Sequence, residues 1–562
     1  SPGWTNSQRI ANTYQYTDNF TWIKGKHSLK LGGDIRRIQS TLTNPQTQPR
    51  GLFHFDGNYS SNLGAGGTGS PWASFLLGYP YRVERDFVDT RPGVRMLYWG
   101  FYLQDDYRIT SKLTLNVGLR WDLFTRPVEK YNRQSNFDLG DGLIHVASSS
   151  DRGPNVDNFT RGFGPRVGLA YSPDNGKTAI RAAYGISYFP DNFGATGGTL
   201  ERNYPFFLLN VLQQPNQFVP TRSVSDGLPG FTPVPLAPTL NPPPGFAVWF
   251  IARNFRQDMA QMWNFSVQRQ LGWKTMVEAA YLGTRGTHIY RDRDINVPLP
   301  APGSFDERRP YYSLAPNVTE IHQRNGDGDS YYNALQVKVE KRFSDGFQML
   351  TAYTFSKSID TVSSPLFPYF DSLNRGLSAG FKAVDIPQNL VMSYSYELPM
   401  GTGKPYLSGG SALARKVLGG WSINGITTVQ SGQPLVMSVA TSRLNTGTGN
   451  RPDITCTSVG TPKRVDAWLD TGCFADPAPY TFGNSGIGHV RGPGLVNFDF
   501  SVFKKTAIDE RRSIEFRAEF FNLFNNPHFA NPNTTYGSGS FGRISGTVLT
   551  PREIQMGLRF AF

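Results

Sequence analysis

An alternating run of oxygen-bearing side chains is the first candidate for chemistry. Asn325, Asp327 and Asp329 are separated by glycines, as ligands are in calcium-binding loops. A loop of the EF-hand type also needs a bidentate acid at its twelfth position, where this chain has Gln336. The pattern therefore predicts a polar loop before a strand, and no metal site.

Histidine, glycine and serine patterns form no catalytic constellation. The seven histidines are too scattered to suggest a chelating pair, and Gly447-Thr448-Gly449 lacks a following helix pattern. Ser431-Gly432 is a Ser-Gly pair, but no Gly-x-Ser-x-Gly stands in a strand–turn–helix context. A triad assembled across strands stays open as an alternative. We expect no enzyme, no catalytic residue and no cofactor.

Charged residues at alternating positions are candidates for lining a polar path. Within 512–525 they share the polar face of a predicted strand, and others lie on comparable strands. These candidates are Arg120, Asp122, Glu515, Arg517, Glu519 and Arg559. The alternative is a structural role in cross-strand ion pairs, with neighbours such as Asp499, Glu553 or Arg559.

Aromatic residues in long irregular segments could contact an external ligand. The candidates are Tyr204, Phe206, Phe207, Tyr311 and Tyr312. They could equally pack the segments against each other.

The last strand of the chain indicates what positions these residues. Ile554, Met556, Leu558, Phe560 and Phe562 share one face, and the other face is polar or small. Termini usually fray, so a strongly apolar terminal strand is typical of a membrane barrel that must close. Gln555, Gly557, Phe560 and Phe562 also resemble the C-terminal assembly signal of outer-membrane barrels.

Composition agrees with strands rather than helices in a membrane. Of 562 residues, 38% are hydrophobic and mean hydropathy is −0.38, and no apolar run approaches the roughly 20 residues of a spanning helix. Aromatics reach 14%, as in barrels with interfacial girdles. The net charge of +13 is scattered without a basic block, so we expect no nucleic acid as partner. Basic loops facing an anionic outer leaflet, or an anion-favouring lumen, fit this charge better.

Two cysteines lie in one Gly/Pro-rich stretch. Cys456 and Cys473 could form a disulfide in an oxidising compartment, or stay free. Their neighbourhood holds no His-Cys cluster that would favour zinc.

Seven hairpins precede the terminal strand. The paired segments are 10–23 with 27–39, 94–108 with 112–124, 163–171 with 177–189, 259–270 with 274–290, 331–343 with 347–357, 388–398 with 421–430, and 495–505 with 512–525. Long irregular segments separate them: 41–93, 125–162, 190–258, 291–330, 358–387, 431–494 and 526–551. Short turns on one side and long loops on the other are typical of outer-membrane barrels.

The strand count predicts the extent of the barrel. Seven hairpins and the final strand make fifteen strands, whereas a bacterial barrel needs an even number. We therefore expect an all-β fold, a large antiparallel transmembrane β-barrel of about 16 or more strands, with short periplasmic turns and long extracellular loops. At least one strand is expected before residue 10, unless a segment such as 75–88 supplies it, so 1–562 is expected to be the C-terminal barrel part of a larger protein.

Several stretches resemble the barrel of TonB-dependent outer-membrane receptors, specifically the Oar-like branch. They are Phe75-Leu-Leu-Gly78, Leu113-Thr-Leu-Asn-Val-Gly-Leu-Arg-Trp-Asp122, Tyr332-Asn-Ala-Leu-Gln336, Tyr353-Thr-Phe-Ser-Lys357, Gly420-Trp421, Gln430-Ser-Gly432, Arg491-Gly-Pro-Gly494, Phe516-Arg-Ala-Glu-Phe-Phe-Asn-Leu-Phe-Asn525 and Phe541-Gly542. The resemblance implies uptake of a bulky ligand across the cell outer membrane.

It also implies partners: outer-membrane lipid, the barrel-assembly machinery, and the TonB complex acting through a TonB box and plug domain. Neither of these two elements, nor a signal peptide, is visible in this sequence. A passive porin-like channel and a surface adhesion or matrix-organising protein are the alternatives. No motif identifies the ligand.

Overall fold

The computed structural model describes residues 8–43, 51–62, 68–88, 92–154, 156–174, 176–189, 200–213, 222–230, 234–362, 380–381 and 385–562. The predicted turn residue Asn175 and parts of the predicted irregular segments 41–93, 125–162, 190–258 and 358–387 lie outside these residues.

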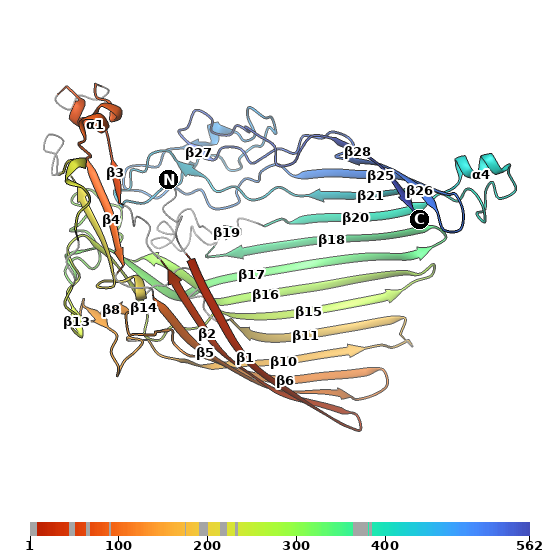
Figure 1. Cartoon of the computed structure of the whole chain (residues 1–562), viewed down its shortest axis with the longest axis horizontal. Helices are drawn as coiled ribbons and strands as arrows, with labels where there is room; N and C mark the ends of the chain where they lie inside the picture. The colour runs from red at the N-terminus through yellow and green to blue at the C-terminus, as the bar shows by residue number, and fades with distance from the viewer. Residues whose placement is uncertain are drawn as a thin grey trace.

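The described chain is dominated by one sheet of eighteen strands (Figure 1). Three of them are short side strands, β7 (Val128–Glu129), β14 (Phe246–Ile251) and β19 (Gly380–Phe381). The remaining fifteen strands, which we call the wall, are the fifteen predicted from the hairpins. They are β1 (Gln8–Lys24), β2 (His27–Thr43), β5 (Gly93–Arg108), β6 (Leu113–Phe124), β10 (Phe159–Tyr171), β11 (Thr178–Tyr188), β15 (Met259–Gln270), β16 (Thr275–Asp294), β17 (Val318–Ser344), β18 (Phe347–Asp360), β20 (Gln388–Glu397), β21 (Trp421–Gln430), β25 (Leu495–Ala507), β26 (Ser513–Phe521) and β28 (Glu553–Ala561).

Each wall strand pairs antiparallel with the wall strand that precedes or follows it in the chain. Within the described residues, β1 pairs with β2 alone and β28 with β26 alone, so the wall has two edges and is not closed. The all-β fold class predicted from the sequence is confirmed as a large antiparallel sheet.

The pairing register keeps one face of the wall apolar from strand to strand. Leu31 of β2 lies opposite Leu103 of β5, which lies opposite Leu119 of β6. These side chains are 48%, 56% and 50% exposed, which suits contact with lipid rather than water. At the other edge Phe516 lies opposite Leu558 in the same way. We call this the apolar face, and the opposite side of the wall the polar face.

The two ends of the wall differ. The hairpin turns gather at one end, next to the short helix α4 (Ala412–Leu418), and the long connections gather at the other end (Figure 1). The turns are tight where glycine takes positive φ, as at Gly25 (φ 58°) and Gly346 (φ 78°). We call these the turn end and the connection end. The predicted short periplasmic turns and long extracellular loops correspond to the turn end and the connection end respectively.

The long connections are folded rather than structureless. They contain α1 (Pro71–Leu77) and two three-stranded sheets, one of β3 (Leu52–His54), β4 (Arg82–Val88) and β12 (Phe207–Gln213), the other of β8 (Ser135–Phe137), β9 (Ile144–Val146) and β13 (Thr239–Leu240). Two further two-stranded sheets join β22 (Ser438–Val439) to β27 (Thr535–Tyr536) and β23 (Asp453–Ile454) to β24 (Phe474–Ala475). No helix of the described residues is long and apolar enough to cross a membrane.

One boundary prediction was wrong. The predicted irregular segment 291–330 is too long, because β16 continues to Asp294 and β17 begins at Val318. The segment 75–88, the alternative source of a further strand, does not join the wall; it forms the end of α1 and then β4, which pairs outside the wall. In both places tertiary pairing extends or recruits segments whose local pattern is ambiguous.

Candidate functional site

A cluster of charged side chains lies on the polar face of β2, β5 and β6. Tyr98 Oη donates a hydrogen bond to Asp122 Oδ1 at 2.5 Å, and Arg120 Nε donates to the same oxygen at 2.9 Å. Arg120 also donates to Tyr98 Oη. Asp122 is only 3% exposed, so these two donors supply the compensation that a buried carboxylate needs.

The cluster continues onto β2. Arg36 forms an ion pair with Asp34 at 2.5 Å, and its guanidinium lies 5.2 Å from the centre of the Tyr98 ring. Gln15 of β1 donates to Asp34 Oδ1 at 3.1 Å. The result is a continuous polar network over four neighbouring strands. The negative charges of its two acids equal the positive charges of its two arginines.

Gly100 makes room for this network. It lies opposite Asp34 on one side and Asp122 on the other. A Cβ at this position would lie 2.4 Å from both Tyr98 Oη and Arg120 Nη2. Since a contact that short requires a shift, glycine is what lets the two side chains cross the strand.

A second charged group lies on the polar face of β26 and β28. Arg517 forms an ion pair with Glu515 of its own strand and lies over the Phe503 ring, 4.9 Å from its centre. Glu515 is opposite Arg559 in register, and Glu519 is opposite Gln555. Within the described residues no ion pair joins Glu519 or Arg559 to a partner across the strands. All six predicted charged candidates therefore lie on the polar face; that they line a ligand path stays a prediction.

The predicted loop aromatics are mostly packed. Phe206 and Phe207 are 5% and 8% exposed. Tyr204 and Tyr311 pack against a buried cluster formed by Phe137, Ile144, Val248, Phe250, Ala315, Val318 and Ile321. Tyr312, at 37% exposed, is the most accessible of the five. Packing thus accounts for four of them, and ligand contact by any of the five stays a prediction.

The terminal strand carries the predicted assembly signal along one exposed edge. Phe560 and Phe562 stack with ring centres 5.9 Å apart, and they are 53% and 93% exposed. Gln555 and Gly557 lie on the opposite face, with nothing within 4 Å of a Cβ built on Gly557. Recognition of these residues by assembly machinery stays a prediction.

The candidate calcium motif lies inside a strand rather than in a loop. Residues 325–329 belong to β17, where Asp327 pairs with Arg293 at 3.2 Å and with Arg291 at 4.0 Å. A Cβ on Gly326 would lie 2.5 Å from the Arg256 carbonyl oxygen. Glycine at this position therefore allows the two backbone segments to approach closely. The described residues contain no group of three or more His, Cys, Asp or Glu that could hold a metal ion.

The connection between β21 and β25 has a core of its own. Leu435, Met437, Trp468, Leu469 and Val490 pack with Ile544, which comes from the connection between β26 and β28. Cys456 and Cys473 form a disulfide beside this core, with Cα atoms 5.2 Å apart. Of the two possibilities that the sequence allows, the structure selects the paired one.

The motif Phe516–Asn525 ends in a turn stabilised by asparagines. Asn522 and Asn525 both have positive φ, at 50° and 55°. The Asn522 side chain accepts from the Asn526 backbone amide at 2.9 Å and donates to the Asn526 carbonyl at 2.9 Å. Asn525 Oδ1 accepts from the Arg552 amide at 2.9 Å, which ties the turn to the start of β28. The Phe516–Asn525 motif therefore forms the end of β26 and a turn held by asparagine side chains.

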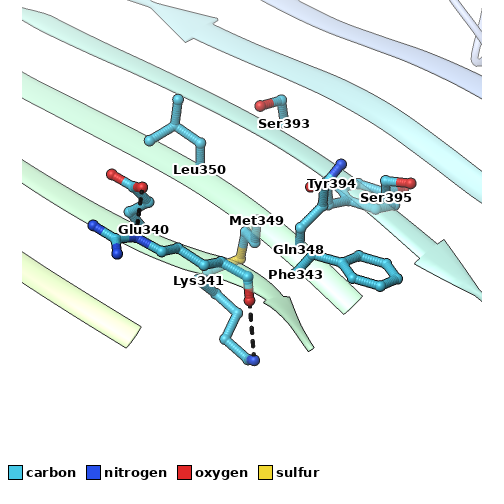
Figure 2. A pocket seen from close by; sticks show the side chains of 10 residues that line it. Glu340, Lys341, Phe343, Gln348, Met349, Leu350, Ser393, Tyr394 and Ser395 are labelled. Carbon is cyan, nitrogen blue, oxygen red and sulfur yellow. Dashed lines mark hydrogen bonds and ion pairs between the residues drawn. The ribbon is translucent and has the colours of Figure 1, made fainter. Parts of the chain in front are cut away.

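A pocket of about 590 Å³ lies by the turn between β17 and β18. Figure 2 shows the side chains that line it. Glu340 lies between two cations there, 2.9 Å from Lys338 and 3.5 Å from Arg342. Gln348 and Leu350 of β18 and Ser393 and Ser395 of β20 also line it, as do the cations Lys341 and Arg342. The pocket therefore presents short polar groups together with cationic side chains at the turn end of the wall.

Sequence reasoning missed the contribution of β2 to the charged network. Asp34 and Arg36 belong to the predicted hairpin of 10–23 with 27–39, where polar neighbours obscure the alternation. The alternation of the strand would have placed these residues on the polar face. Lys30, Asp34 and Arg36 share that face, while Leu29, Leu31 and Ile35 share the other.

Comparisons with known proteins agree with this architecture. A family model described as an outer membrane beta barrel domain matches residues 1–555. No curated protein matches the chain.

Solved structures similar to this chain include two transporters and a receptor. They are the transporter YddB from Escherichia coli (9% identity, 99% of this chain and 55% of that chain, TM-score 0.49), the FrpB iron transporter from Neisseria meningitidis (12%, 98% and 55%, 0.45) and the siderophore receptor PiuA from Acinetobacter baumannii (12%, 98% and 56%, 0.41). The chain spans about half the length of these proteins.

Proposed function

The chain belongs to the outer membrane beta barrel domain family and lies in the outer membrane, and we propose that it is the wall of a transporter that takes up a bulky ligand. The observation that carries the proposal is the charged polar face of a sheet this large. Barrels of about eight strands are filled by their own side chains, whereas those of about 16 or more enclose a wide lumen. Fifteen long strands with Arg120, Asp122 and Arg517 on the inner side support a wet interior wide enough for a large solute.

TonB-dependent gating is part of the proposal for the whole protein. Its support is the ordered set of motifs between Phe75 and the terminal strand that resembles TonB-dependent receptors. In that arrangement a plug domain occupies the lumen and a TonB box connects it to the inner membrane. The Oar-like branch remains a prediction on the same motifs.

The test is conductance and uptake by the full-length protein. In planar bilayers a plugged receptor gives little steady conductance, and ligand accumulation in cells stops when TonB is absent. A large steady conductance with TonB-independent uptake would overturn the proposal in favour of a passive channel. Loss of cell–cell contact on shortening the segment 190–258, with uptake intact and no effect of TonB, would favour an adhesion protein.

Insertion by the barrel-assembly machinery is the second part of the proposal. Phe562 ends the chain on the apolar face and is almost fully exposed, so its loss leaves the fold's packing intact. We expect removal of Phe562 to lower the amount of folded protein in the outer membrane, while refolding in detergent stays normal. Equal loss in both assays would mean that Phe562 acts in folding alone.

A further inference from the structure

A basic groove lies on the apolar side of the wall at its connection end. It has a volume of about 770 Å³, and five cations line it: Arg37, Arg95, Arg126, Lys130 and Arg152. Gln39, Thr125 and Asn158 add uncharged polar groups, and Leu97 adds an apolar one.

The register places this groove on the lipid-facing side rather than in the lumen. Arg37 lies opposite Leu97, and Gln39 lies opposite Arg95. Leu97 shares its face of β5 with Trp99, Phe101 and Leu103, whose side chains are 39%, 41% and 56% exposed. Because alternate residues of a strand point the same way, Arg37 and Arg95 continue the apolar face toward the connection end.

Most of this positive charge is not neutralised by the protein. Arg126 pairs with Asp151 at 3.0 Å, and Arg152 donates to the backbone carbonyl of Glu129 at 3.0 Å. Within the described residues no ion pair involves Arg37, Arg95 or Lys130.

The neighbouring acid, Glu129, does not supply the missing charge partner. It is fully buried, and its carboxylate accepts from the backbone amides of Gly93, Tyr131 and Arg133 at 3.0, 2.6 and 2.9 Å. The groove is therefore left with a net positive charge.

Its height in the membrane follows from the aromatic residues beside it. Tyr14 of β1 lies opposite Arg37. Trp99 lies two residues after Leu97, the residue opposite Arg37 on β5, and on the same face of that strand. Such aromatic residues sit at the level of lipid headgroups in membrane barrels. The cations of the groove thus lie where the phosphates of the outer leaflet would be.

We propose that this groove binds the phosphorylated headgroup of an outer-leaflet glycolipid. Arginine guanidinium groups donate paired hydrogen bonds to phosphate oxygens, and Arg37 and Arg95 are available for this. Acyl chains of the same molecule would lie along Leu97, Trp99 and the rest of the apolar face. A free anion would not use this apolar surface, whereas the acyl chains of a lipid would.

The experiment compares lipid retention by three forms of the full-length protein in detergent. They are the wild type, a groove variant (Arg37→Gln, Arg95→Gln, Lys130→Gln) and a charge-matched control at the turn end (Arg269→Gln, Lys274→Gln, Arg511→Gln). Each is incubated with a bis-phosphorylated glucosamine glycolipid or with the same lipid after removal of both phosphates. Native mass spectrometry then counts the lipid bound to each protein, with and without millimolar inorganic phosphate.

We expect the groove variant to retain the phosphorylated glycolipid at least tenfold more weakly, since each cation near an anionic surface contributes about fivefold. The turn-end control and the wild type should be equal, and both should prefer the phosphorylated lipid. Equal retention by the groove variant, or equal retention of the dephosphorylated lipid, would overturn the proposal. Displacement by inorganic phosphate alone would overturn it in favour of a free-anion site.

Folding is followed in parallel by resistance to trypsin. If the groove variant does not fold, Arg37→Gln alone is measured, because Arg37 is exposed and has no ion pair within the described residues. About fivefold weaker retention is then expected. Unchanged retention by folded Arg37→Gln would overturn the proposal.

Discussion

Arg491 and Asp385 are joined by an ion pair of 2.6 Å although 106 residues separate them in the chain. The Asp385 side chain is 1% exposed, and its second oxygen accepts from the backbone amide of Ser358 in β18 at 2.7 Å. Arg491 also donates to the carbonyl oxygens of Asp385 and Gly432, both at 3.1 Å. The Arg491 guanidinium therefore connects the folded connection 431–494 to the wall, through Asp385 at β18 and β20.

Arg491→Met should loosen this attachment strongly. Removing the partner of a buried carboxylate costs about 3–5 kcal/mol, because the charge is left without compensation. The expected result is a lower midpoint of unfolding in urea and faster trypsin cleavage within 431–494. Arg464→Met is the control, since its ion pair with Asp466 is 3.5 Å long and exposed on both sides. Equal effects of the two variants would contradict this account.

Loss of the disulfide should destabilise the same connection. Cys456→Ser with Cys473→Ser frees a loop whose ends lie beside the buried cluster around Trp468 and Leu469. Disulfides of this kind contribute about 2–4 kcal/mol. Limited proteolysis of the double variant should cut within 431–494, while the wall strands stay protected. Wild-type protein treated with a reductant should give the same fragments; an intact connection in both would contradict the prediction.

Replacing Asp122 should lower the free energy of unfolding far more than replacing Glu519, although both residues lie on the polar face. Asp122→Ala leaves Tyr98 and Arg120 without their shared acceptor in a buried position, at a cost of about 3–5 kcal/mol. Glu519 makes no ion pair within the described residues, so Glu519→Ala should stay within about 0.5 kcal/mol of the wild type. Thermal unfolding of both variants in one detergent makes the comparison. Similar melting temperatures would show that the network around Asp122 is not stabilising.

Asp258 should make stability depend on pH between about 4 and 6. It precedes β15 at the connection end, and burial raises its pKa from 3.8 to about 6, although the Tyr290 amide donates to it. The folded state therefore holds the proton more tightly than the unfolded state. This contribution to stability is present below pH 4 and is lost as pH rises through about 6.

Asp258→Asn should accordingly raise stability at pH 7 and leave it unchanged at pH 4. Asp509 provides the opposite case, because its hydrogen bond from Arg512 lowers its pKa. Asp509→Asn should reduce stability at pH 7 and have no effect in acid. The contribution of Asp509 is lost only as pH falls below 3.8, so urea unfolding is measured from pH 7 to well below that value to test both signs. Parallel curves for Asp258→Asn and the wild type would refute the first.

Alternation along the chain predicted the wall well because a strand's facing is a local property. In the segment 113–121 apolar residues alternate with polar or small ones, and the structure forms the predicted strand there as β6, with the predicted apolar face. The apolar residues are Leu113, Leu115, Val117, Leu119 and Trp121. Motifs were less informative about roles. Residues 325–329 suggested a loop but form part of β17, and Phe516–Asn525, which carries part of the family resemblance, forms the end of β26 and the turn after it. A short motif does not say which distant strand will pair with it.

The sequence by itself determined that this protein is a wall of antiparallel strands with one apolar face, because a period of two and short turns are encoded within a few residues. The tertiary structure alone decided what meets across those strands. It gathered Asp34, Tyr98 and Asp122 into one network, fastened Arg491 to Asp385, and brought Arg37, Arg95 and Lys130 together beside the lipid-facing stripe. Such contacts depend on register between segments far apart in the chain, and register is set by packing of the whole sheet.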